Sequence, residues 1–155
     1  MAGTVIEDER LQYHPIFEDE LMVVAPAAPI YTDWQQKPVG IAQLLEAPFV
    51  TREEGSGTWT EIESYLKQQG YDSGALRIVA RMDNPDAIVK SVEQGLGITV
   101  LSSLAASEYL RKGDVLVFAL DGKSVRRKIY LVRDKLEKLP PEAEAFANFA
   151  VRLGK

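Results

Sequence analysis

The sequence predicts an α/β protein, in which short buried strands alternate with amphipathic helices along most of the chain. The run Leu21–Ala25 (LMVVA) is apolar throughout, which is typical of a strand buried on both faces. Between Ile62 and Gln69 the apolar residues recur at helical spacing, and Gly70 follows as a helix stop. Because such strands and helices take turns along the chain, we expect a sheet of largely parallel strands covered by helices.

Local signals place the other elements. Asn84 before Pro85 is a helix cap followed by the proline of a first turn, whereas His14 before Pro15 is expected in an exposed turn. The dipeptide 121–122 (Asp-Gly) predicts a turn between two strands. The expected strands are 4–6, 21–25, 48–51, 76–81, 98–101, 115–120 and 126–132. The expected helices are a short turn at 39–45, one stopping at Gly70, one from Asn84 to Gly95, one from Ser102 or Ser103 to about Gly113, and one opening at Pro140 and Pro141 with Phe146, Phe149 and Leu153 on one face.

The composition is that of a soluble globular protein of one domain or two small lobes. The chain has 155 residues, of which 46% are hydrophobic and 26% charged. It has no cysteine and a single histidine, which excludes disulfides, thiolate nucleophiles and multi-histidine metal sites. The net charge of -5 argues against a nucleic-acid surface on this chain. No apolar run approaches the roughly 18 residues of a membrane span, and the acidic N-terminus does not look like a signal peptide. We therefore expect a cytoplasmic protein or a segment of a longer one.

The stretch Thr51–Leu66 (TREEGSGTWTEIESYL) carries the most suggestive chemistry. Its residues Gly55, Ser56, Gly57 and Thr58, called the glycine-rich turn below, stand at the mouth of a predicted helix. The first amides of a helix have no internal partner and attract anions, and glycines let a ligand approach the backbone. The turn is therefore a candidate anion site. The alternative is a simple cap, in which Ser56 or Thr58 caps the helix and the glutamate at position 61 completes a capping box.

Other motifs do not indicate an enzyme or a cofactor site. The turn lacks the third glycine of a dinucleotide loop, and no Gly-Lys-Ser/Thr phosphate loop occurs. Glu53 and Glu54 are neighbours on an extended segment, so they would point to opposite faces and would not converge as an acid/base pair. The basic run 126–128 on a predicted strand is typical of a protected sheet edge. We expect no catalytic residues, no metal and no cofactor.

The ordered set of motifs resembles a known family. The sequence contains FEDELMVVAPAAP, then PVGIAQLLEAPFVTREEGSGTWTEIESYL, then RMDNPDAIVKSVEQGLGITVLSSLAASEYLRKGDVLVFAL, and finally RRKIYLVRDKLEKLPPEAEAFANF. From about Thr4 to Leu153 it is similar to the effector-binding domain of LysR-type transcriptional regulators. The resemblance implies a periplasmic-binding-protein-like (type II) fold, with two α/β lobes joined by two crossover strands and a small effector between them.

The resemblance also implies a division of the chain and a site. Residues 1–26 would be part of lobe one with the outgoing crossover strand, 27–119 lobe two, and 120–155 the return strand and last helix of lobe one. The effector contacts would be Gly55, Ser56, Gly57 and Thr58, with Asn84 as a further contact, and the effector a carboxylate or small oxyanion. Trp59 stands where the family often carries arginine, a departure that removes a charge from the expected site.

The implied partners follow from what the sequence does not contain. A complete family member has a helix-turn-helix and the first part of lobe one, and neither pattern is found here, so DNA would be bound by a part of the parent protein outside this chain. An uncovered edge of lobe one implies that the chain self-associates. An alternative interpretation is a fragment of a solute-binding protein of an ABC-type transporter, which shares the fold. An α/β enzyme is a further alternative, but it needs a converging catalytic set that the sequence does not show.

Overall fold

The computed structural model describes residues 5–111, 114–121 and 126–153. The chain forms two compact units: the larger holds residues 20–125, and the smaller holds 1–19 together with 126–155. The strand β1 (Leu11–Pro26) belongs to both. The lobe boundaries expected from the resemblance, at 26/27 and 119/120, stay a prediction.

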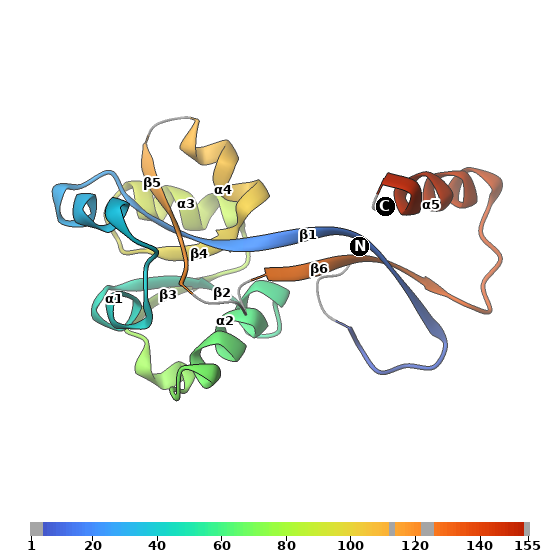
Figure 1. Cartoon of the computed structure of the whole chain (residues 1–155), viewed down its shortest axis with the longest axis horizontal. Helices are drawn as coiled ribbons and strands as arrows, with labels where there is room; N and C mark the ends of the chain where they lie inside the picture. The colour runs from blue at the N-terminus through green and yellow to red at the C-terminus, as the bar shows by residue number, and fades with distance from the viewer. Residues whose placement is uncertain (1–4, 112–113, 122–125, 154–155) are drawn as a thin grey trace. The chain divides into compact units, whose positions relative to one another are not determined.

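The larger unit contains most of the helices and strands (Figure 1). In chain order they are η1 (Pro29–Gln36), α1 (Ile41–Glu46), β2 (Phe49–Arg52), α2 (Gly57–Gln68), η2 (Ser73–Ala75), β3 (Ile78–Met82), α3 (Pro85–Glu93), β4 (Thr99–Ser102), α4 (Ser103–Leu110) and β5 (Val115–Ala119). In Figure 1 the strands of this unit lie between α3 and α4 above and α1 and α2 below. The alternation of strands and helices expected from the sequence is confirmed.

Strand direction differs from the expectation of a largely parallel sheet. Strands β2 and β3 pair in parallel, but β1 pairs antiparallel with both β4 and β5. An unbroken apolar run shows that a strand is buried and does not show the direction of its neighbours, which explains the error.

Packing explains why Leu21–Ala25 is apolar throughout. Val23 belongs to the main core cluster with Phe49 and Ile62, whereas its neighbour Val24 belongs to a second cluster with Val92. Successive side chains on a strand point to opposite faces, so β1 is covered on both sides.

The smaller unit contains the first half of β1, β6 (Arg126–Asp134) and α5 (Pro141–Leu153). β6 pairs with β1. Arg127 bonds Asp19, while Arg133 bonds Gln12, so the two strands run in opposite directions. The two crossover strands expected from the resemblance therefore lie in one sheet, which the segment 5–6 does not join.

Two expectations for the N-terminal segment are wrong. Val5 and Ile6 are exposed and form no strand, and Thr4 lies outside the described residues. His14 and Pro15 lie within β1 and not in a turn. Pro15 is exposed, and proline is accepted within a strand where the ladder does not need its missing N–H.

The last helix turns its small residues inward. Ala147 and Ala150 are buried, whereas Phe146 and Phe149 are 58% and 59% exposed. Phe146 and Phe149 are three positions apart and share one helical face, which agrees with the expected apolar face. Three expectations fall outside the described residues: the side chain of Leu153, the helix end expected near Gly113 and the turn expected at Gly122.

Candidate functional site

The candidate site lies at the carboxyl ends of two parallel strands. β2 leads through residues 53–56 into α2, and β3 leads through Asp83 and Asn84 into α3. In the pairing of these strands Thr51 lies opposite Arg81, and the amide of Glu53 donates to the carbonyl of Met82 at 3.2 Å. In open α/β sheets this edge is where ligands bind. The glycine-rich turn and Asn84 therefore emerge at the same edge of the sheet.

Ser56 is the residue that caps α2. Its Oγ accepts from the amide of Trp59 at 3.1 Å, and its carbonyl accepts from the amide of Thr60 at 3.0 Å. Thr58 is the second residue of the helix, so the alternative capping box between Thr58 and Glu61 does not form. Since the cap satisfies the amide of Trp59, the first-turn amides of Gly57 and Thr58 remain as donors for a ligand.

Gly55 supports the turn through its backbone conformation. Its φ is +86°, in the left-handed region that side chains other than glycine rarely adopt. No atom lies within 4 Å of the place where its Cβ would be. The glycine is therefore required by the turn and leaves open space beside it.

Asn84 caps α3 and keeps two donors. Its Oδ1 accepts from the amides of Asp86 at 2.8 Å and Ala87 at 3.3 Å. The side-chain NH₂ group is not used in these bonds and can donate to a ligand. Asp86, however, places a carboxylate in the first turn of α3, so this helix end attracts an anion less than the end of α2 does.

Thr51 is a further candidate that the sequence argument missed. Its side chain lies near the end of β2 and is 1% exposed. Its Oγ1 has no hydrogen-bond partner among the described residues. Buried hydroxyls are almost always bonded, so this unsatisfied hydroxyl, in the strand that leads into the glycine-rich turn, makes Thr51 a candidate contact. A hydroxyl residue at a strand end just before a Gly-Ser-Gly turn is a signal that could have found it.

Arg81 is the second missed residue. Its guanidinium lies 4.3 Å from the centroid of the Trp59 ring. One guanidinium nitrogen, Nη1, donates to the carbonyl of Arg52 at 3.4 Å, and Nη2 lies 4.0 Å from Oε1 of Glu54. Alternation along β3 predicts which face Arg81 takes and gives no information on which helix meets that face, which is why the sequence did not reveal this contact.

The two glutamates before the turn do not converge. Glu53 is bonded to Arg52 at 2.7 and 2.8 Å, and this hydrogen bonding lowers the pKa of the Glu53 carboxyl. A lowered pKa is the opposite of what a general acid needs. Glu54 instead faces Arg81.

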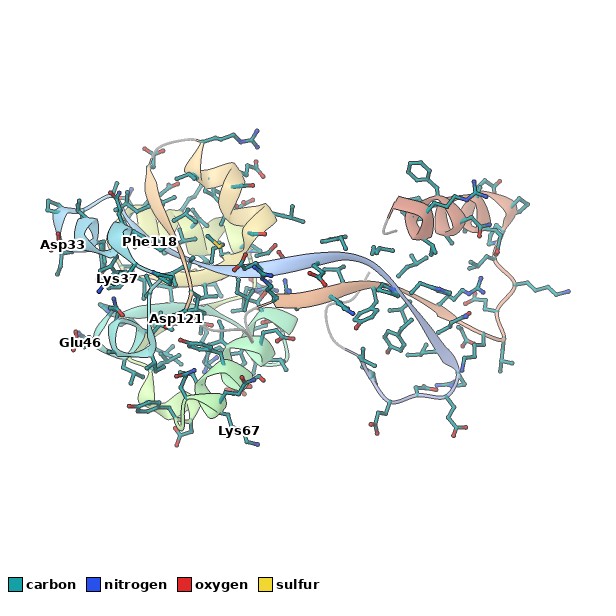
Figure 2. The ribbon with its side chains drawn as sticks, in the orientation of Figure 1. Asp33, Lys37, Glu46, Lys67, Phe118 and Asp121 are labelled. Atoms are coloured by element: carbon teal, nitrogen blue, oxygen red, sulfur yellow. The ribbon has the colours of Figure 1, made fainter. Side chains whose placement is uncertain are left out.

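A separate cleft lies elsewhere on the larger unit. It has a volume of about 450 Å³ and is lined by residues of η1, of β5 and of the segment just after η1, among them Trp34, Phe118 and Lys37. Figure 2 labels Lys37 and Phe118. Trp34 stacks edge-on against Phe118 and Tyr31, whereas Trp59 is a core residue with 2% exposure. Among the described residues no group of three or more His, Cys, Asp or Glu side chains could hold a metal ion.

The larger unit is an α/β body that presents the capped start of α2 at the carboxyl edge of its parallel strands, where ligands bind in open α/β sheets. The family model described as the LysR substrate binding domain matches residues 1–154, and the chain belongs to this family. The fold and family expected from the sequence motifs are confirmed, and the regulator is favoured over the transporter protein.

Individual relatives agree with this assignment. The chain is 28% identical over 151 residues to the RuBisCO operon transcriptional regulator of Allochromatium vinosum. The matched region covers 97% of this chain and 48% of that regulator. The CcmR regulatory domain of Synechocystis PCC6803, solved in complex with 2-PG, has a TM-score of 0.83 at 21% identity and covers 99% of this chain and 72% of that one. The effector binding domain of QuiR, solved with shikimate, has a TM-score of 0.80 at 21% identity and covers 97% of this chain and 69% of that one.

The chain spans about half the length of the curated relatives it matches, and the two structures show likeness of fold alone. The relatives named above are a transcriptional regulator, a regulatory domain and an effector binding domain. No helix among the described residues is long and apolar enough to cross a membrane.

Proposed function

We propose that this domain senses a small anionic effector, which binds at the glycine-rich turn of the larger unit. The observation that carries the proposal is the pair of first-turn amides on Gly57 and Thr58, together with the buried, unpartnered hydroxyl of Thr51 in the strand that leads into the turn. Amides at a helix N-terminus bind carboxylates and phosphates without needing a lysine. The two solved relatives hold 2-PG and shikimate, which supports an anionic effector for this chain.

Each proposed contact has a role. Ser56 and Thr58 supply hydroxyls, while the amides of Gly57 and Thr58 supply backbone donors. Gly55 keeps the approach to the backbone open, and Asn84 adds a side-chain amide from the neighbouring helix.

The proposal extends to the longer protein. An effector that binds one conformation of the regulator more tightly would shift the population and with it the affinity for DNA. DNA would be bound by a helix-turn-helix region outside this chain, and this acidic chain would not bind DNA specifically by itself. The place of action would be the cytoplasm, where such a regulator meets DNA.

Self-association is part of the same proposal. Phe146 and Phe149 form an exposed apolar face on α5, and exposed apolar faces of this kind recruit other chains. A second copy of the chain would cover that face.

A substitution of one glycine tests the site without removing the helix. Proline is well accepted at the first position of a helix and has no N–H, and Ser56 already has the extended conformation that precedes a proline, with φ -69° and ψ 142°. Gly57→Pro should therefore weaken binding of inorganic sulfate, measured by calorimetry, by about tenfold or more, the equivalent of one hydrogen bond to a charged group.

The matched control is Gly57→Ala, which adds a Cβ but keeps the amide, and which should bind sulfate nearly as the original chain does. Thr58→Ala should also weaken binding, whereas Ser64→Ala on the exposed side of the same helix should not. Equal sulfate affinity of the proline and alanine variants would rule out the site at this helix.

A further inference from the structure

We propose that Arg81 is the cation that binds an anionic effector at this site. In the absence of effector the carboxylate of Glu54 forms a weak ion pair with Arg81, and the effector displaces it. The inference rests on the proposed function, because it concerns the same site. It assigns the positive charge of the site to β3, although the helix itself carries a tryptophan where the charge was expected.

The position of Arg81 supports this role. Its guanidinium contacts the ring of Trp59, the third residue of α2. The amide of Trp59 is bonded to Ser56. Arg81 therefore reaches from the strand to the same helical turn that presents the free amides.

The guanidinium is held in place but its donors are not exhausted. Trp59 is 2% exposed and part of the core, so it is a rigid surface for the guanidinium to stack on. A stacked guanidinium keeps its N–H groups directed along its edge, where they can bind a carboxylate or phosphate with two bonds. Of its five donors, the described contacts use one, in a long bond of 3.4 Å to the carbonyl of Arg52.

Glu54 is the group that an effector would displace. Its carboxylate lies 4.0 Å from Arg81, beyond hydrogen-bond distance, and its side chain is 82% exposed. Such surface pairs are weak. Glu53 is not available for this role, since both of its oxygens are bonded to Arg52.

Charge balance shows why the cation matters. The strand ends and the loops that follow them carry the carboxylates Glu53, Glu54 and Asp83, and the cations Arg52 and Arg81, which leaves one net negative charge. Without Arg81 the amides of α2 would have to attract an anion against two net negative charges. The repulsion between these carboxylates and the anion would then oppose the attraction of the amides.

The test uses inorganic sulfate on the whole chain, at constant ionic strength, with calorimetry and the fluorescence of Trp59. The chain has two tryptophans, so a Trp34→Phe background leaves Trp59 as the single reporter. Arg81→Met should weaken sulfate binding about tenfold or more, the equivalent of a charge-assisted hydrogen bond. Glu54→Gln should strengthen it by about twofold to fivefold, because the competing carboxylate is removed.

Matched controls separate local from general charge effects. Arg77→Met removes a positive charge from the exposed residue just before β3, and Glu63→Gln removes a negative charge from the exposed side of α2; both should leave sulfate affinity unchanged. Arg81→Lys keeps the charge and should retain part of the binding. A melting temperature for each variant shows that it is folded, and the lysine variant carries the test if the methionine variant unfolds.

The outcomes distinguish this inference from the proposed function. If Gly57→Pro weakens sulfate binding and Arg81→Met behaves like Arg77→Met, the site stands and the role of Arg81 is overturned. If sulfate does not bind the original chain, or the proline variant binds it unchanged, the site at α2 fails and the inference fails with it. Weaker binding in both Glu54→Gln and Arg81→Met would overturn the displacement step, because the carboxylate would then be helping the anion to bind.

Discussion

Thr51 has a buried hydroxyl that costs stability and that we propose as an effector contact. Its Oγ1 is buried and has no hydrogen-bond partner among the described residues. Leaving a buried polar group unsatisfied costs about 1–3 kcal/mol. Thr51→Val should therefore leave the free energy of unfolding unchanged or raise it by about 1 kcal/mol in chemical denaturation, while sulfate binding becomes weaker.

A clear loss of stability in Thr51→Val would show that the hydroxyl already has a partner in solution, such as a bound water. Unchanged sulfate affinity would show that the effector does not reach the end of β2. The two measurements together decide whether the unpaired hydroxyl belongs to the site.

At the residue scale, local signals were easier to predict than contacts across the sheet. Ser56 and Asn84 cap their helices, as their residue types and the neighbouring glycine and proline indicated. A cap depends on atoms three residues apart, so the sequence contains the whole interaction. The stacking of Arg81 on Trp59 joins residues 22 positions apart, and its existence depends on how β3 and α2 pack.

At the scale of elements, a buried ion pair joins β1 to β6. Two nitrogens of Arg127 lie 2.9 Å from Oδ2 of Asp19, and the two side chains are 12% and 1% exposed. Arg127→Met removes a charged partner of the buried Asp19 carboxylate, and breaking a buried pair of this kind costs about 3–5 kcal/mol. We expect much faster hydrogen exchange of the β6 amides in this variant.

Arg126→Met is the matched control, since Arg126 is the exposed neighbour on the same strand, and its β6 amides should exchange at the original rate. The double variant Arg127→Met with Asp19→Asn should recover part of the protection, because the buried charge is gone. Equal exchange in the two single variants would show that the ion pair does not hold the strands together.

Tyr109 joins α3 and α4 in a way that depends on pH. Its hydroxyl donates to Oδ1 of Asp86, and this hydrogen bond, together with burial, raises the pKa of Tyr109 to about 12. In the unfolded chain tyrosine titrates near 10. Between about pH 10 and pH 12 the unfolded chain loses this proton while the folded chain keeps it, so stability is full below that window and falls within it.

Tyr109→Phe should therefore show a smaller fall in the free energy of unfolding between pH 9 and pH 12, measured by chemical denaturation. Burial also raises the pKa of Tyr31 and Tyr65, so part of the fall should remain. The control Tyr71→Phe, at an exposed position, should keep the whole fall. An identical pH profile in Tyr109→Phe and the original chain would contradict the role of the bond to Asp86.

The elements that the sequence predicted well are those with complete local signals. The helices α2 and α3 begin at a cap and are followed by Gly70 and Gly95, both with φ above +80°. The first half of β1 was missed because Pro15 and polar residues interrupt its apolar pattern, and it pairs with β6 more than 100 residues later. Local propensity cannot report a partner so distant in the sequence.

At the scale of the whole molecule, the open face of α5 predicts the state of association. Phe146 and Phe149 are both more than half exposed, and Leu136 nearby in the chain is 81% exposed. Burying two aromatic side chains and the apolar surface around them would favour a second copy on this face, since each such side chain contributes about 1.5–3 kcal/mol when fully buried. Light scattering at micromolar concentration should therefore show a mass above that of the 17.2 kDa chain.

Replacing both phenylalanines with serine should return the chain to a monomer, because the exposed face then no longer gains from being covered. The control is Leu104→Ser with Leu110→Ser, which removes two similarly exposed apolar side chains from α4 in the larger unit. If these leucines and not the phenylalanines control the mass, the contact lies on the larger unit. A clean monomer with a cooperative melt in the original chain would contradict this prediction. Association depends on concentration, so a monomer at micromolar concentration would show that covering the α5 face does not stabilise a dimer enough.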